Sequence, residues 1–180
     1  MLKNWEVTLP GLTGKRTRKA YIWLPDCYEE DDVRRYPVLY LFDGHNTFVD
    51  GEATYGKSWG LASYLTWTKK PLIVVGVECN TRGNGRLREY SPVSFSDEKY
   101  GNVRGQGRKY MQWLVEELKP YIDENYRTMA YPTDEMLDWA NQMVDANPNK
   151  KVIVSTHGYF EGPLREDRGR YYPSAIGPPC

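Results

Sequence analysis

Apolar and polar residues alternate at the start of the chain in a way that predicts two strands. Trp5, Val7 and Leu9 are separated by polar residues, which is typical of a strand with one buried face. Residues 20–24 (AYIWL) form a second run rich in β-formers, closed by a proline. Residues 11–14 between them contain two glycines and favour a turn. We therefore expect an antiparallel pair to open the domain.

Two continuous apolar runs follow, at residues 37–42 (PVLYLF) and 72–77 (LIVVGV), and each predicts a buried parallel strand. Residues 58–68 between them place apolar side chains at helical spacing. A strand, a helix and a strand in this order imply a right-handed crossover within a parallel sheet. The expected fold class is therefore α/β, a three-layer α/β/α domain with a mainly parallel sheet.

The segment at residues 78–108 is polar, rich in Gly, Asn and Arg, and shows no secondary-structure period. A loop of this length in a compact domain is usually functional or mobile. Residues 111–122 then carry apolar side chains at i, i+3, i+4, i+7 and i+11, which predicts an amphipathic helix.

The last third of the chain predicts a further helix–strand unit. Thr133 suits a helix N-cap, an apolar stripe follows it, and the next proline stops the helix at about residue 147. Residues 151–155 (KVIVS) read as another buried strand. We expect one domain over residues 1–162 and a flexible tail over residues 163–180, where the chain becomes charged and then rich in Pro and Gly.

Composition and charge narrow the classes of partner. The 180 residues include 24 Lys plus Arg and 24 Asp plus Glu, so no net basic charge attracts nucleic acid or an anionic membrane. The most basic run, at residues 15–19, predicts a solvated strand edge. No apolar stretch has the length of a signal peptide or a membrane span. Three widely spaced cysteines make a poor disulfide framework. These features favour a cytoplasmic, soluble protein, and no cofactor is expected.

Six segments together resemble a known enzyme family. In chain order they read RKAYIWLPDCYEE, YPVLYLFDGHNTF, GKSWGLASYL, LIVVGVECN, GRLREYSP and WLVEELKPYIDENYRT. They are similar to the esterase group that includes enterochelin esterase and esterase D, over about Lys3 to Thr128. The resemblance implies a partial α/β-hydrolase fold. It also implies hydrolysis of a small-molecule carboxylic ester through a serine acyl-enzyme.

The resemblance assigns a role to the turn that follows the run at residues 37–42. In the family this turn supplies a backbone N–H to the oxyanion hole, so the implied residues are Gly44, His45 and Asn46. Attack on an ester builds negative charge on the carbonyl oxygen, and preorganised N–H donors stabilise that charge.

The resemblance also makes Arg86, Arg88, Glu89 and Tyr90 part of a segment that borders the substrate pocket. A structural alternative is open for two of these residues. Arg88 and Glu89 would then pin the segment to the rest of the domain through charge-assisted hydrogen bonds.

The family's nucleophile has no counterpart at the expected place. A glycine-flanked serine on a strand-to-helix turn should follow ENYRT, whereas this chain continues MAYPTDEMLDWANQ. Residues 56–60 match G-x-S-x-G, but Ser58 follows a loop-like stretch and is expected to cap the next helix. Ser58, Asp134 or Asp145, and His157 have the order of a catalytic triad, which does not show that they meet.

Residues 133–159 resemble a fragment of a calcineurin-like metallophosphoesterase, whose histidine after this strand ligates a metal. In this chain that histidine is His157, and Asp43 with His45 matches the family's D-x-H pattern. The chain contains only two histidines, too few for the full two-metal site. Two alternatives to the esterase therefore stay open: a fragment of a metal-dependent phosphoesterase, and a hydrolase-like domain that binds its ligand without catalysis.

Overall fold

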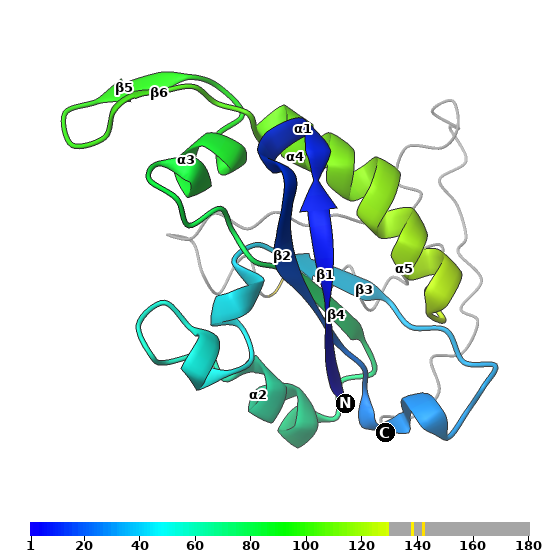
Figure 1. Ribbon diagram of the computed structural model, residues 1–180. Coiled ribbons are helices and arrows are strands. Elements are labelled where there is room, and N and C mark those ends of the chain that lie inside the picture. Colours follow the sequence, from blue (N-terminus) through cyan, green and yellow to red (C-terminus); the bar gives the residue numbers. More distant parts are fainter. Residues whose placement is uncertain (130–137, 139–141, 143–180) are drawn as a thin grey trace.

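The computed structural model of the protein describes residues 1–129, 138 and 142. Figure 1 shows the order of the elements along this part of the chain. They are β1 (Leu2–Leu9), α1 (Pro10–Thr13), β2 (Gly14–Trp23), η1 (Asp26–Glu29), β3 (Val38–Leu41), η2 (Gly44–Asn46), η3 (Asp50–Glu52), α2 (Leu61–Thr68), β4 (Ile73–Val77), α3 (Gly85–Tyr90), β5 (Phe95–Asp97), β6 (Gly101–Val103), α4 (Gly107–Trp113), η4 (Leu114–Leu118) and α5 (Lys119–Asn125).

The main sheet of the described residues has four strands in the order β1-β2-β4-β3 (Figure 1). The predicted antiparallel pair β1–β2 and the predicted parallel pair β3–β4 are both confirmed. The expectation of a mainly parallel sheet is wrong for these residues, because β2 also pairs with β4 in antiparallel fashion. The reason is that β2, the second strand of the N-terminal hairpin, runs opposite to β4 and pairs with the side of β4 that faces away from β3. Only the crossover through α2 makes a parallel pair.

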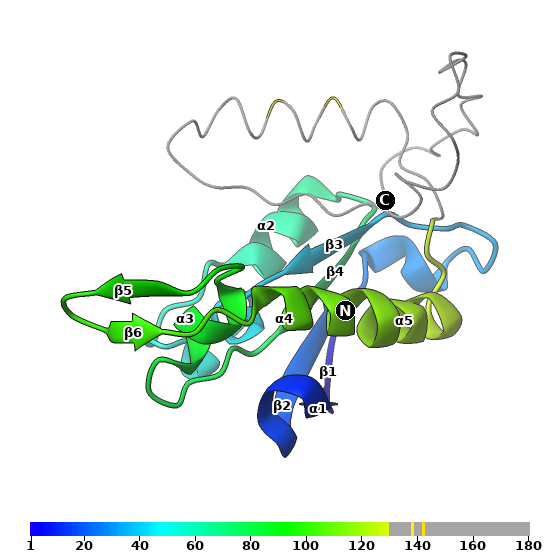
Figure 2. The ribbon, with the colours of Figure 1, turned by 90° about the horizontal axis from the view of Figure 1, so that it is seen from above.

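Alternate side chains of β2 and β4 divide the apolar core between the two faces of the sheet. Ile22 and Val75 belong to a cluster that includes the buried side chains of α4, η4 and α5. Tyr21 and Val74 belong to a second cluster, with Leu65 of α2. Figure 2 shows α2 and the α4–α5 run on opposite sides of β3 and β4. The described sheet is therefore covered on both faces, while a three-layer arrangement of the complete domain stays a prediction.

The helix predicted over residues 111–122 is part of a longer helical run that includes α4, η4 and α5. Its middle turn, η4, has π-helical hydrogen bonding. Pro120 explains this widening, because it has no N–H to donate and its ring clashes with the carbonyl four residues earlier. Leu114, Leu118 and Ile122 are buried as the stripe predicts, but Val115 is 49% exposed at the edge of the stripe.

The segment at residues 78–108 contains structure that the sequence did not predict. It includes the six-residue helix α3 and the antiparallel hairpin β5–β6. Gly101 opens β6 with φ of 66°, a left-handed conformation that glycine adopts without strain. Each element spans only three to six residues. Elements this short leave no detectable period in the sequence.

Several predictions fall outside the described residues. They include the helix after Thr133, the strand at residues 151–155, the end of the single domain at residue 162 and the tail at residues 163–180. Within the described residues, no helix is both long and apolar enough to cross a bilayer.

Candidate active site

The centre of the candidate site is the turn at residues 43–46, which follows β3. Asp43 has φ 55° and ψ 44°, an uncommon left-handed conformation for a residue with a side chain. Asn46 donates its N–H to the carbonyl of Asp43 at 2.8 Å, which closes the turn. Gly44 lies against β4 so closely that a Cβ atom there would stand 2.5 Å from the carbonyl carbon of Gly76. The turn can therefore reach the carboxyl end of β4 only with glycine at position 44.

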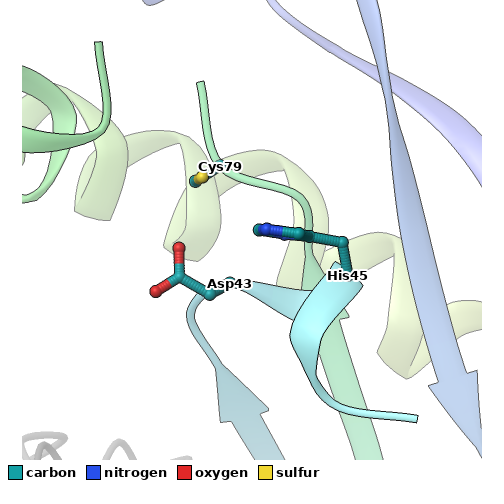
Figure 3. Close-up of side chains that lie close together, drawn as sticks. All are labelled: Asp43, His45 and Cys79. Carbon is teal, nitrogen blue, oxygen red and sulfur yellow. The ribbon is translucent and has the colours of Figure 1, made fainter. Parts of the chain in front are cut away.

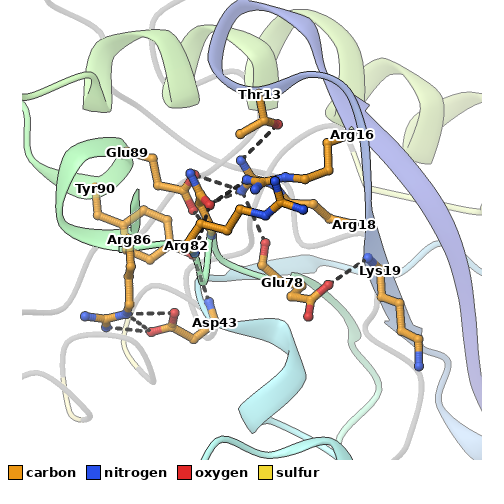
Figure 4. A network of polar contacts seen from close by, with 11 residues as sticks. Thr13, Arg16, Arg18, Lys19, Asp43, Glu78, Arg82, Arg86, Glu89 and Tyr90 are labelled. Atoms are coloured by element: carbon orange, nitrogen blue, oxygen red, sulfur yellow. Dashed lines mark hydrogen bonds and ion pairs between the residues drawn. The ribbon is translucent and has the colours of Figure 1, made fainter. Parts of the chain in front are cut away.

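Helix α3 holds the turn from one side (Figure 4). Arg86 donates from Nε and Nη2 to the two carboxylate oxygens of Asp43, at distances of 2.6 to 3.0 Å. The carboxylate raises the pKa of this guanidinium. The Asp43 N–H donates to the hydroxyl of Tyr90 at 3.2 Å, and burial raises the pKa of that hydroxyl. These contacts maintain the left-handed conformation of Asp43.

The segment at residues 54–61 holds the turn from another side. Thr54 Oγ1 lies 2.9 Å from Nε2 of His45, and the Thr54 N–H donates to Oδ1 of Asn46 at 2.8 Å. Trp59 donates its backbone N–H to the carbonyl of Asn46 at 2.8 Å. Together with β4 and α3, this segment fixes the backbone of the turn before any ligand binds. Such preorganisation is what stabilisation of a developing negative charge requires.

Glu89, predicted to border the pocket, is an interior anchor of α3. Its carboxylate lies 2.8 Å from Nη1 of Arg18 on β2, and the two side chains are 2% and 3% exposed. Asn80 also donates its backbone N–H to Glu89, at 2.6 Å. Burial raises the pKa of the Glu89 carboxyl, and the Asn80 amide and the Arg18 guanidinium oppose that rise. Glu89 thus pins α3 in the way the structural alternative predicts, whereas Arg88 is exposed.

Lys15, Thr17 and Lys19 are exposed, as predicted for a solvated strand edge, but Arg18 in the same run is buried. Arg18 lies under α3 and also donates to the hydroxyl of Thr13 at 3.2 Å and to the carbonyl of Glu78 at 3.4 Å. Figure 4 shows these contacts converging between β2 and α3. The sequence gives little sign of this, because the buried partner Glu89 is 71 residues away along the chain.

A third side chain joins Asp43 and His45 at the carboxyl ends of β3 and β4. One ligand-type atom each of Asp43, His45 and Cys79 lies within 4.8 Å of the other two, and all three residues are buried (Figure 3). The sequence reasoning missed Cys79, although its place two residues after β4 is where α/β folds gather functional groups. Burial and the neighbouring Asp43 carboxylate raise the pKa of the Cys79 thiol to about 12. The thiol is therefore neutral at physiological pH and is not an activated nucleophile.

Ser58 neither caps α2 nor lies on a nucleophile elbow. The N-cap of α2 is Gly60, in a left-handed conformation and without a side-chain capping bond, so the predicted cap is wrong. Ser58 Oγ instead donates to Oδ1 of Asp50 at 2.7 Å and accepts from the Gly60 N–H at 3.3 Å. The contacts from Ser58 and Lys57 lower the pKa of the Asp50 carboxyl. The preceding element is the 3₁₀ turn η3. A strand there would be needed to expose the hydroxyl of a nucleophile.

Of the other predicted catalytic and metal-binding residues, some belong to the described part of the chain and some do not. Asp43 and His45 of the proposed D-x-H pair do lie together. His157, Asp134 and Asp145 lie outside the described residues, so the catalytic and metal roles predicted for them stay predictions.

A family model described as "Putative esterase" matches residues 13–137. The chain belongs to this esterase family. The match agrees with the resemblance expected over about residues 3–128 and includes the 43–46 turn, Cys79 and α3. The comparisons give no support to the metallophosphoesterase resemblance of residues 133–159. No significant match was found among curated proteins.

Solved structures of several proteins resemble the chain over most of its length. An IroE-like serine hydrolase from Shewanella oneidensis is 25% identical with a TM-score of 0.51, and the match covers 72% of this chain and 40% of that one. The BES protein from Bacillus cereus is 22% identical, with a TM-score of 0.47 and coverages of 71% and 47%. An S-formylglutathione hydrolase from Agrobacterium tumefaciens is 17% identical, with a TM-score of 0.42 and coverages of 73% and 46%. The chain therefore spans less than half the length of these three proteins.

Proposed function

We propose that the chain is a carboxylic-ester hydrolase-type protein that binds the carbonyl group of a small-molecule ester at the 43–46 turn. The observation that carries the proposal is the way this turn is built, in a chain of the esterase family. Gly44 permits contact with β4, and Arg86 and Thr54 hold the turn from two sides. A turn fixed in this manner can present backbone N–H groups to a carbonyl oxygen without reorganising.

The proposal narrows the set of oxyanion donors. The Asn46 N–H already donates to the Asp43 carbonyl, so it closes the turn and does not serve the ligand. We assign the carbonyl contact to the N–H groups of Gly44 and His45. Arg86 acts as a positioning residue, because it holds Asp43 in the conformation that orients the next two N–H groups.

The proposal also limits what the described residues do in hydrolysis. An acyl-enzyme mechanism needs a serine exposed on a strand-to-helix turn. The serines of residues 1–129 lie elsewhere: in α2, at the end of α3, in β5 or in loops, at positions 58, 63, 91, 94 and 96. We therefore propose that this part of the chain binds the ester without supplying a nucleophile.

The test combines binding, turnover and covalent labelling. Phenyl butyrate binding is followed by calorimetry, and turnover is measured with p-nitrophenyl butyrate. A fluorophosphonate probe with mass mapping then locates any reactive serine. We expect saturable ester binding that Gly44→Ala abolishes and Gly51→Ala retains, because the Gly51 position has open space around it.

Each contrary result has a defined meaning. Absence of saturable ester binding would end the proposal. A labelled serine within residues 1–129 would show that a nucleophile exists there, and a labelled Ser58 would identify it directly. Turnover that depends on a serine beyond residue 129 would place the nucleophile outside the described residues and leave the role of the turn intact.

A further inference from the structure

We propose that Asp43, His45 and Cys79 form a binding site for one zinc-type divalent metal ion at the carboxyl ends of β3 and β4. The inference concerns side chains, whereas the proposed ester site uses backbone N–H groups, and it stands independently of ester binding. It also differs from the metal site predicted from the sequence, since Cys79 takes the place of His157.

The geometry brings three different donors to one point. Asp43 comes from the residue pair after β3, His45 from η2, and Cys79 from the segment after β4, and Figure 3 shows their side chains converging. Their nearest ligand atoms are all within 4.8 Å of one another. In a tetrahedral zinc site, bond lengths of about 2.0 to 2.3 Å place ligand atoms roughly 3.3 to 3.7 Å apart. Side-chain adjustments of about an ångström would therefore close the site around an ion.

The imidazole of His45 provides the second observation. The side chain is 6% exposed, and its Nδ1 atom is buried without a hydrogen-bond partner. Buried polar atoms nearly always have a hydrogen-bond partner, so a buried Nδ1 atom without one needs an explanation. Nε2 lies 2.9 Å from Thr54 Oγ1. When Nε2 donates its proton to Thr54, the Nδ1 lone pair is available for a metal, the arrangement seen when a second contact orients a metal-bound histidine.

The donor set selects the class of metal. One thiolate, one imidazole and one carboxylate match the mixed sulfur, nitrogen and oxygen ligands of zinc, and they are unlike the all-oxygen sites of calcium or magnesium. Three protein ligands leave a fourth position for water. Zinc takes cysteine as the thiolate, so binding of the ion would release the proton of the Cys79 thiol to solvent.

Arg86 opposes the ion and so offers a sensitive test. Its guanidinium contacts both Asp43 oxygens, but the side chain is 54% exposed and can move toward solvent. Removing the positive charge at position 86 should tighten metal binding.

Cobalt titration of the full chain tests the proposal. We expect one Co²⁺ per chain with a thiolate-to-cobalt charge-transfer band that Zn²⁺ displaces. Cys79→Ser should remove the band, and Arg86→Gln should lower the Co²⁺ concentration needed for half-saturation. His157→Gln is the matched control, because the chain has only two histidines and this variant should keep the band.

X-ray absorption of the zinc-loaded wild-type chain keeps the test independent of whether variants fold. It should report one sulfur at about 2.3 Å together with nitrogen or oxygen ligands. Failure to bind, a zinc shell without sulfur, or a cobalt band that persists in a folded Cys79→Ser variant would each overturn the site. None of these readouts measures ester binding, so they leave the proposed function untouched.

Discussion

Substituting Gly44 by alanine tests the packing on which the candidate site depends. The new Cβ would lie 2.5, 2.6 and 2.8 Å from the Gly76 carbonyl carbon, the Val77 nitrogen and the Gly76 oxygen. All three are backbone atoms of β4, so no side chain can rotate to relieve the overlap. Gly44 has no left-handed φ, which means that the effect comes from overpacking alone.

The expected cost follows from the kind of contact. Inserting a methyl group into a packed interior costs about 1 to 3 kcal/mol when neighbours must shift. For a chain of this size, each kcal/mol lowers Tm by about 2 to 4 °C. We therefore expect Tm to fall by roughly 2 to 12 °C. A glycine-to-alanine change at an unstrained position would otherwise tend to stabilise, because it reduces the entropy of the unfolded chain.

Thermal unfolding followed by circular dichroism measures the effect, and Gly51→Ala is the control. Gly51 lacks a positive φ and has no atom within 4 Å of its Cβ position, so its Tm should stay close to that of the wild type. A Gly44→Ala protein as stable as Gly51→Ala would refute the close packing of the turn on β4.

Three further predictions concern the groups around the turn. Glu89→Gln should lower the free energy of urea unfolding by about 3 to 5 kcal/mol, because Arg18 would stay buried without a counter-charge. The double variant Arg18→Met with Glu89→Leu should recover much of this loss, because it replaces both charges with apolar side chains. Alkylation of Cys79 should be about a thousandfold or more slower in the metal-free native chain than in denaturant, because the pKa of its thiol is raised to about 12. Peptide mapping measures the two rates, and equal rates would contradict the burial of Cys79. Arg86→Gln should lower stability by about 1 to 3 kcal/mol, because it leaves the Asp43 carboxylate, whose side chain is 8% exposed, without its charged partner. It should also weaken ester binding measurably in calorimetry.

The regular part of the fold could be predicted because its signals are local. Alternation identified β1, a run of β-forming residues identified β2, and continuous apolar runs identified β3 and β4. The elements of residues 78–108 were missed, since three to six residues are too few to show a period. The direction of β2 against β4 depends on how the chain runs between the hairpin and the parallel pair, and local patterns do not carry that information.

The sequence predicted only the part of the candidate site that comes from one continuous segment of the chain. The 43–46 turn follows a recognisable strand, so its place could be inferred from the sequence and the family resemblance. The Arg18–Glu89 pair and the approach of Cys79 to Asp43 join segments far apart in the chain. Such pairings arise from the strand order, and a charged residue such as Arg18 looks solvent-exposed until its partner is known.

One contact links the two proposed activities of this edge of the sheet. Leu41 on β3 is paired with Gly76 on β4, so Asp43 and Cys79 emerge side by side from adjacent strands. The approach of Gly44 to Gly76 then sets both the backbone N–H groups of the turn and the spacing of the three metal-ligand side chains. Gly44→Ala should therefore weaken cobalt binding as well as abolish ester binding. Cys79→Ser should abolish cobalt binding and spare ester binding, because its side chain contributes nothing to the N–H groups of residues 44 and 45.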